Sequence, residues 1–112
     1  MSNNHYVDYI LDILSPIGGI KARKMFGGYR IYKNGIFFAL IAEDVLYFKV
    51  DDSNRADYES HGSKPFTYEG KSKKTVVMSY WQVTEDILED HNELALWVAK
   101  ALKVATKAKK QK

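Results

Sequence analysis

The feature that most constrains the fold of this sequence is a tight turn, Asn34-Gly35, set between two runs of aromatic and aliphatic residues. Asn and Gly tolerate the positive φ angles that a two-residue hairpin turn requires. The runs on either side, 24–32 and 36–42, are therefore expected to pair as antiparallel strands. A further turn at Glu43-Asp44 leads into a third apolar run, 45–50, so the sequence predicts a three-stranded meander with 36–42 at its centre.

A second hairpin is expected later in the chain. Residues 65–69 alternate between apolar and polar side chains as a strand does, and 75–81 form a further strand after a polar loop. Between the two hairpins, the polar run Asp52-Ser53-Asn54 is typical of a helix cap and predicts a short helix over 54–60.

Helical patterns are expected at both ends of the chain. Apolar residues recur at helical spacing from Asn4 to Leu14, and Pro16 ends that helix. Asp90 and Glu93 fit a capping box for a long last helix, which follows a short helical turn from Thr84 to Leu88. The sequence therefore predicts an α+β fold with an antiparallel sheet of about five strands flanked by helices, in the order α-β-β-β-α-β-β-α.

Composition excludes several classes of protein. The chain has 112 residues, which suits one domain. It contains no cysteine, so disulfides, iron–sulfur clusters and thiolate zinc sites are excluded. No apolar stretch reaches the ~18 residues that a membrane-spanning helix needs. The N-terminal residues lack the basic start and apolar run of a signal peptide, so we expect a cytoplasmic protein with no membrane contact.

The formal net charge of +3 is unevenly distributed. Six lysines lie within the last thirteen residues, with no acid among them. Residues 1–99 then hold eleven basic and fourteen acidic side chains, a balance of −3. We expect a mildly acidic folded domain over 1–102 and a lysine-rich tail over 103–112 that frays from the last helix.

The sequence offers no recognisable catalytic or metal-binding motif. His5, His61 and His91 have no metal-ligand spacing to one another or to an acid. Adjacent acids such as Asp51 and Asp52 point their side chains apart, which favours helix capping over a carboxylate dyad. Nucleophile-elbow, Walker and dinucleotide-binding patterns are absent. We therefore expect no catalytic residues, no metal, no cofactor and no enzymatic activity.

The glycine pair Gly27-Gly28 has two interpretations. A glycine pair inside a strand usually marks a bulge or a sharp bend. Alternatively, the bare amides of Gly27 and Gly28, beside Arg23 and Lys24, could bind an anion or a small ligand.

The lysines also have two interpretations. A solvated helix end is one, because cations are favoured near a helix C-terminus. Nucleic-acid binding is the other, because Lys100, Lys103 and Lys107 lie on neighbouring helical turns and could face a phosphate backbone. The hairpin loop between 69 and 75 would add Lys71, Lys73 and Lys74 to such a contact. No aromatic residue interleaves with the tail lysines, so base stacking by the tail has no support.

The aromatic residues suggest an interface. Some of them are expected to face outward, because a small sheet cannot bury both of its faces under three helices. Tyrosine and tryptophan at an exposed face suit contact with a protein partner, and a homodimer is one such contact.

An ordered set of motifs carries a resemblance to a known family. Its members are Met25-Phe-Gly-Gly-Tyr-Arg-Ile-Tyr32, Gly35-Ile-Phe-Phe-Ala-Leu-Ile-Ala42, Leu46-Tyr-Phe-Lys49, Asp52, Asn54, Gly62, Pro65-Phe-Thr-Tyr68, Val77-Met-Ser-Tyr-Trp81, Leu88-Glu-Asp90, Leu94 and Trp97. In this order they resemble the N-terminal domain of the TfoX/Sxy family, from about residue 5 to residue 102.

The resemblance implies an α+β fold with a curved antiparallel sheet and a role without catalysis. The family is associated with regulation of natural competence for DNA uptake. Its longer members act as coactivators beside a cyclic-AMP-responsive transcription factor, and their C-terminal helical domain has no counterpart in this sequence. The resemblance therefore favours a regulatory domain that binds a protein, with the transcription machinery as the class of partner that the resemblance implies. Nucleic-acid binding and anion binding are the alternatives.

Overall fold

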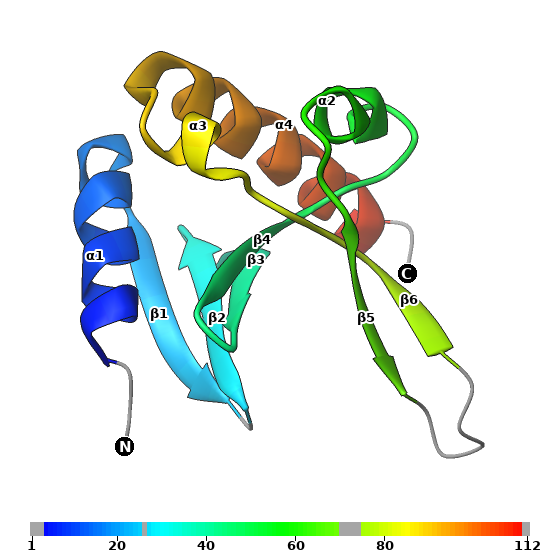
Figure 1. The fold of residues 1–112 in the computed structure, drawn as a ribbon. Helices are drawn as coiled ribbons and strands as arrows, with labels where there is room; N and C mark the ends of the chain where they lie inside the picture. The colour runs from blue at the N-terminus through cyan, green and yellow to red at the C-terminus, as the bar shows by residue number, and fades with distance from the viewer. Residues whose placement is uncertain (1–3, 26, 70–74, 111–112) are drawn as a thin grey trace.

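The computed structural model describes residues 4–25, 27–69 and 75–110, and it consists of one antiparallel sheet with helices packed on one of its faces (Figure 1). The α+β class and the antiparallel sheet are thus confirmed. The helices are α1 (Asn4–Leu14), the 3₁₀ turn η1 (Ser15–Ile17), α2 (Arg55–Ser60), α3 (Glu85–Leu88) and α4 (His91–Lys110). The strands are β1 (Ile20–Met25), β2 (Gly28–Lys33), β3 (Ile36–Ala42), β4 (Val45–Lys49), β5 (Pro65–Glu69) and β6 (Thr75–Gln82).

The sheet has six strands in the order β1-β2-β3-β4-β6-β5, one more than the sequence predicted. The extra strand arises at Gly27, where φ is +84° and the chain reverses between β1 and β2. Expecting one strand over 24–32 with a bend inside it was therefore wrong. The expected three-stranded meander is a four-stranded one, and β3 lies inside the sheet as predicted.

The other turns agree with the sequence. Asn34 and Gly35 both have positive φ, 48° and 84°, and connect β2 to β3. Glu43 and Asp44, with φ of 50° and 62°, connect β3 to β4. The β5–β6 hairpin projects away from the helices in Figure 1, and β6 pairs with β4 over residues 80–82 only.

A β-bulge decides which aromatic side chains enter the core. Ile31 pairs with Ala39 and Tyr32 with Phe37, so Phe38 is an additional residue on β3. Phe38 is fully buried, and its ring centroid lies 5.6 Å from that of Phe48. Phe37 points to the opposite face, where its ring lies 5.6 Å from that of Tyr32.

One face of the sheet carries the core, and we call it the helix-covered face. Every helix from α1 to α4 contributes buried side chains to the same hydrophobic cluster as Ile31, Phe38, Ile41 and Phe48. Full burial of each such side chain contributes about 2 kcal/mol. The opposite face, which we call the helix-free face, carries Leu40 and Tyr80, which are buried but lie outside that cluster.

The helix ends follow the sequence in part. α1 has the predicted bounds. Asp90 begins α4 as predicted, because its Oδ1 accepts hydrogen bonds from the amides of Asn92 and Glu93, both at 3.2 Å. The expected boundary at residue 102 falls inside α4, which continues to Lys110 with Val104 and Ala105 buried. No described helix is both long and apolar enough to cross a membrane.

Candidate binding faces

The pairing of the strands places a series of aromatic rings on the helix-free face. Tyr32 of β2 lies 5.6 Å from Phe37 of β3, and Phe37 stacks on Tyr80 of β6 at 5.5 Å with an interplanar angle of 29°. We call these three residues the aromatic row. Tyr32 and Phe37 are half-buried, whereas Tyr80 is only 6% exposed and its ring packs against that of Phe37. A further pair, Tyr47 and Phe66, lies beside this row with ring centroids 4.9 Å apart.

Cations surround the aromatic row. Lys21 pairs with Tyr32 across β1 and β2, and Arg23 pairs with Arg30 two positions further along. The guanidinium carbon of Arg30 lies 5.2 Å from the centroid of the Phe37 ring. Lys49 pairs with Tyr80, and its Nζ lies 5.0 Å from the centroid of that ring. We call Lys21, Arg23, Arg30 and Lys49 the four cations.

The described part of the helix-free face holds no acid within its strands. Strand pairing assigns further uncharged residues to this face, namely Met25, Gly28, Leu40, Ala42, Val45, Tyr47 and Gln82. Phe66 joins them through its ring contact with Tyr47. Glu43 in the β3–β4 turn is close enough to Tyr47 to raise its pKa, although burial raises that pKa more. The face is therefore basic along the aromatic row, and the acids near its edges are Glu43 in the β3–β4 turn and Asp51 close to Lys49.

Lys49 and Tyr80 show the electrostatic cost of this arrangement. Burial lowers the pKa of Lys49, and the nearby carboxylate of Asp51 opposes that shift. The Lys49 ammonium donates a hydrogen bond to Ser79 Oγ at 2.8 Å. Burial also raises the pKa of Tyr80 to about 12, while Arg30 opposes the rise. Lys49 is therefore a partly desolvated cation, for which an anion would be a favourable neighbour.

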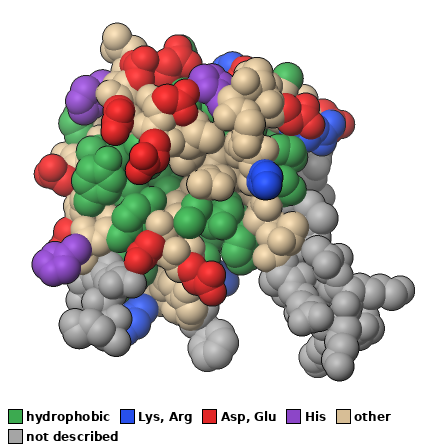
Figure 2. Space-filling model, in the orientation of Figure 1, with side chains coloured by type: hydrophobic (Ala, Val, Ile, Leu, Met, Phe, Trp, Pro, Cys, Tyr) green, Lys and Arg blue, Asp and Glu red, His purple; other side chains and the backbone are tan. Residues whose placement is uncertain are grey.

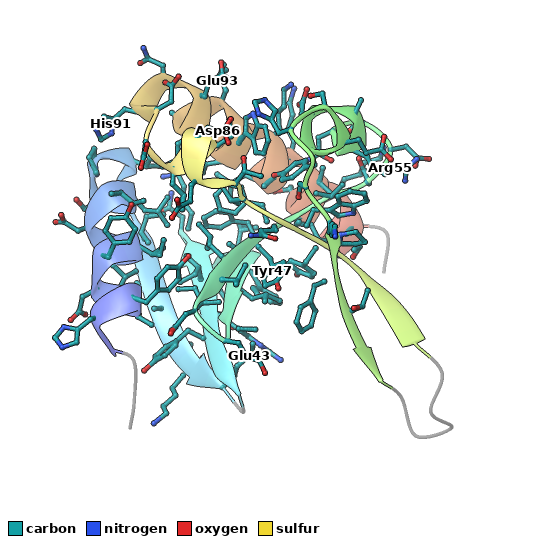
Figure 3. The ribbon with its side chains drawn as sticks, viewed as in Figure 1. Glu43, Tyr47, Arg55, Asp86, His91 and Glu93 are labelled. Carbon is teal, nitrogen blue, oxygen red and sulfur yellow. The ribbon has the colours of Figure 1, made fainter. Side chains whose placement is uncertain are left out.

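The helical side has the opposite charge. Residues 4–14 and 83–99 hold seven Asp and Glu and no Lys or Arg. Asp and Glu side chains surround hydrophobic ones on the face shown in Figure 2, where Lys and Arg are few. Figure 3 places Glu43 at the β3–β4 turn and Asp86 at α3.

Two tyrosines of α1 lie within this acidic surface. The Tyr6 and Tyr9 rings are 6.2 Å apart, and Tyr9 is 46% exposed. Burial raises the pKa of Tyr6, a hydrogen bond to the Leu46 backbone lowers it, and Tyr9, Asp44 and Glu85 add smaller increases. An exposed tyrosine beside carboxylates from α1, α3 and the β3–β4 turn is suited to contact with a basic protein surface.

The residues of the anion site suggested by the sequence do not all lie on one face of the sheet, because adjacent residues of a strand point to opposite faces. Arg23 lies on the helix-free face opposite Arg30, whereas Lys24 pairs with Tyr29 on the helix-covered face. Lys24, Gly27 and Gly28 line a hollow of about 310 Å³ together with Glu43 and Asp44. Gly28 also has a structural role, since a Cβ at this position would lie 2.0 Å from the carbonyl oxygen of Ile41.

Three of the candidate nucleic-acid lysines lie on neighbouring turns of α4, and acids lie near two of them. Lys100 donates a hydrogen bond to Asp57 Oδ2 at 2.7 Å, an exposed pair of small energetic value. Lys103 and Lys107 are exposed on α4, and Lys107 lies near enough to Asp51 to help lower its pKa, after the larger effect of the hydrogen bond from the Ser53 hydroxyl. Lys71, Lys73 and Lys74 lie outside the described residues.

The histidines show no metal site within the part of the chain that the structure describes, where no cluster of three ligating side chains occurs. His61 Nδ1 lies 2.8 Å from Asp86 Oδ2, and the His61 ring packs against the edge of Trp97 with centroids 5.3 Å apart. The Thr84 hydroxyl, and then His61, lower the pKa of Asp86. This exposed pair connects α2 to α3.

Sequence reasoning missed Lys21, Arg30 and Lys49 as a group with the aromatic row. Alternation along β1 and β2 was the available signal, but it required the β1–β2 turn to be placed at Gly27. The position of Phe37 depended in addition on the bulge at Phe38, which no local pattern marks.

The sequence matches the model of a known protein family. The family model of the TfoX N-terminal domain matches residues 12–105. A search of curated proteins found no match.

Proposed function

Because this chain belongs to the TfoX N-terminal domain family, we propose that it is a regulatory domain without enzymatic activity, which acts in transcription control by binding a protein partner. The observation that carries this proposal is the exposure of Tyr9 on the acidic surface of α1. Tyrosine contributes a large contact area at low conformational cost, and it is enriched in protein interfaces.

The charge of this surface specifies the chemistry of the partner. Asp8 and Asp12 lie on α1, and Asp44 and Glu85 lie near Tyr6. A basic partner surface would be attracted to these carboxylates, which mainly increases the rate of association and the choice of partner. A transcription factor or polymerase subunit with an exposed basic patch is the partner class that we propose.

The absence of enzymatic activity is part of the same proposal. Among the described residues, the pKa shifts of Tyr6, Tyr47, Lys49, Tyr58 and Tyr80 are caused chiefly by burial. None of these groups pairs with a second titrating group in the manner of an acid and a base. Such shifts are typical of packing rather than of catalysis.

Site-specific photo-crosslinking tests the proposal. A photoreactive amino acid replaces Tyr9 in cells of the source organism, and the same amino acid at the exposed Glu59 of α2 serves as the control. We expect one discrete covalent adduct from position 9, much weaker from position 59, that mass spectrometry identifies as a protein with a basic patch. The double variant Asp8→Lys with Asp12→Lys should reduce the adduct about tenfold.

Two outcomes would contradict the proposal. Equal adduct yields from positions 9 and 59 would mean that the α1 surface is no specific interface. An adduct consisting of two copies of this chain would instead identify the surface as a homodimer contact, and sedimentation at increasing concentration would then show the dimer directly.

A further inference from the structure

The helix-free face combines features that protein contact at α1 leaves unexplained. It carries the aromatic row of Tyr32, Phe37 and Tyr80, and the four cations Lys21, Arg23, Arg30 and Lys49 surround this row. The acidic side chains of the helical side do not extend into the described strands of this face.

We propose that the helix-free face binds single-stranded nucleic acid, with bases stacked on Phe37 and Tyr32 and phosphates paired with the four cations. This surface is distinct from the α1 surface to which we assign protein contact. Protein binding at α1 and nucleic-acid binding at the helix-free face can therefore be tested independently.

The position of Arg30 shows that the Phe37 ring can accept a flat group from the solvent side. Its guanidinium, a planar cation, lies 5.2 Å from the ring centroid, and Arg30 itself is exposed. A nucleobase is a planar group that stacks on such rings, worth about 1–3 kcal/mol per base. When a base takes this position, Arg30 is free to pair with the adjoining phosphate.

The charges of the face favour a polyanion. Arg23 and Arg30 lie directly opposite each other across β1 and β2, an arrangement of like charges that destabilises the sheet. Lys49 is partly desolvated on the Tyr80 ring. A phosphate backbone that crosses the strands would offset both costs, because each phosphate brings a negative charge close to a cation.

Two hollows on this face have a suitable lining and size. One, of about 540 Å³, is lined by Lys21, Arg23 and Tyr32 together with the β2–β3 turn. The other, of about 460 Å³, is lined by Phe37, Lys49 and Tyr80 at the rim formed by the last turns of α4. Tyr32 lines the first hollow and Phe37 the second, and their rings are in contact. A strand of nucleic acid that follows the aromatic row would therefore reach both hollows.

The geometry favours a single strand over a duplex. The rings form part of a broad sheet surface, which is too wide for the major groove of B-form DNA, where a helix or a two-stranded ribbon fits. Paired bases also hide the faces that would stack on Phe37. An acidic peptide would satisfy the four cations but would leave the aromatic row without planar partners.

Fluorescence anisotropy tests the proposal with the full chain and a labelled oligothymidylate of about 15 nucleotides, in about 50 mM salt. We expect micromolar binding that weakens steeply as salt increases, and much weaker binding of a duplex of the same length. The double variant Arg23→Gln with Arg30→Gln should weaken binding at least about tenfold. Phe37→Leu, which keeps an apolar side chain but removes the stacking surface, should weaken it about fivefold or more.

The matched control removes the same charge elsewhere. Lys100→Gln with Lys103→Gln on α4 should change the affinity less than about twofold if the helix-free face is the site. Circular dichroism and thermal melting show that each variant folds. The single variant Lys21→Gln, at an exposed edge position, remains available if the Arg23 and Arg30 variant is unstable.

Several results would overturn the proposal. They are the absence of oligothymidylate binding at low salt, a larger loss in the α4 variant than in the face variants, and equal affinity for the duplex. Competition by polyglutamate as effective as that by unlabelled oligothymidylate would reassign the face to an acidic protein. The proposal of protein contact at α1, which is tested by crosslinking from position 9, does not depend on any of these results.

Discussion

The ring of Tyr58 in α2 packs against the ring of Trp97 in α4, with centroids 4.2 Å apart and an interplanar angle of 49°. Both side chains are buried, at 1% and 3% exposure. Because α2 has six residues, it is too short to be stable alone, and this contact fixes its position on the core. Trp81 of β6 approaches Tyr58 from another side at 6.4 Å, so three elements meet at this tyrosine.

Removing the hydroxyl of Tyr58 should stabilise the protein. No described residue offers this buried hydroxyl a hydrogen bond, and burial raises its pKa. A buried polar group without a partner costs about 1–3 kcal/mol. We expect Tyr58→Phe to raise the free energy of unfolding by about 1 kcal/mol in urea denaturation, whereas Tyr58→Ala should lower it by about 3 kcal/mol or more. A loss of stability in Tyr58→Phe would show that a buried water satisfies the hydroxyl.

Among the polar residues of the β4–α2 loop, Asn54 is expected to lower the free energy of unfolding most when it is substituted. It is 2% exposed, and its Oδ1 accepts a hydrogen bond from the Asp51 amide at 2.9 Å while its Nδ2 donates one to the Lys49 carbonyl at 3.2 Å. Asn54→Ala should lower the free energy of unfolding by about 2 kcal/mol, because two backbone groups lose their partner. Ser53→Ala, which removes an exposed hydrogen bond to Asp51, should cost less than about 1 kcal/mol. Equal losses would contradict this interpretation.

Local chemistry explains what the sequence could predict. The Asn34-Gly35 turn requires positive φ, and few residues other than Asn and Gly supply it, so the β2–β3 hairpin was predictable. The bounds of α1 were predictable because apolar spacing and Pro16 act within one helix. Asp90 as the cap of α4 is a similarly local signal.

Features that depend on distant parts of the chain were not predictable. Asn54 looks like a helix cap in sequence, yet its side chain makes no capping hydrogen bond and instead stabilises the preceding loop. β1 was missed as a separate strand because Lys21, Arg23 and Lys24 give it no apolar pattern, and its pairing with β2 supplies the structure.

The candidate binding faces show the same limit. Arg23 and Lys24 are neighbours in sequence, which suggested one anion site, but adjacent strand residues point to opposite faces. The aromatic row became visible only once strand pairing brought Tyr32, Phe37 and Tyr80 together from three strands.

Gly27 in the β1–β2 turn and Gly28 at the start of β2 should respond differently to substitution. Gly28→Ala places a Cβ 2.0 Å from the Ile41 carbonyl oxygen, where only backbone movement could relieve the clash. Gly27→Ala meets nothing within 4 Å but retains a φ of +84°. We expect a loss of about 3 kcal/mol or more for Gly28→Ala and of about 1 kcal/mol for Gly27→Ala, measured by urea denaturation. Similar losses at both positions would mean that β2 and β3 do not approach so closely at Gly28.

Tyr80 should make stability depend on alkaline pH. Burial raises its pKa to about 12 in the folded state, against 10.0 for the unperturbed side chain. Between these two values the unfolded chain has lost the phenol proton and the folded protein retains it. The unfolded state therefore binds fewer protons, and the free energy of unfolding falls as pH rises. The contribution is fully present below pH 10 and is lost as pH rises toward 12.

Tyr80→Phe isolates this effect, because it keeps the ring that stacks on Phe37 and removes the titrating hydroxyl. Between pH 9 and pH 11 the wild type should lose about 1 kcal/mol more stability than the variant in urea denaturation. Tyr47→Phe is the matched control, since the Tyr47 pKa is raised less and its ring is more exposed. Its pH dependence should lie close to that of the wild type. If Tyr80→Phe and the wild type lose the same stability over this pH range, the Tyr80 hydroxyl is accessible to solvent. The Tyr80 ring would then pack less closely against Phe37 than the centroid distance of 5.5 Å indicates.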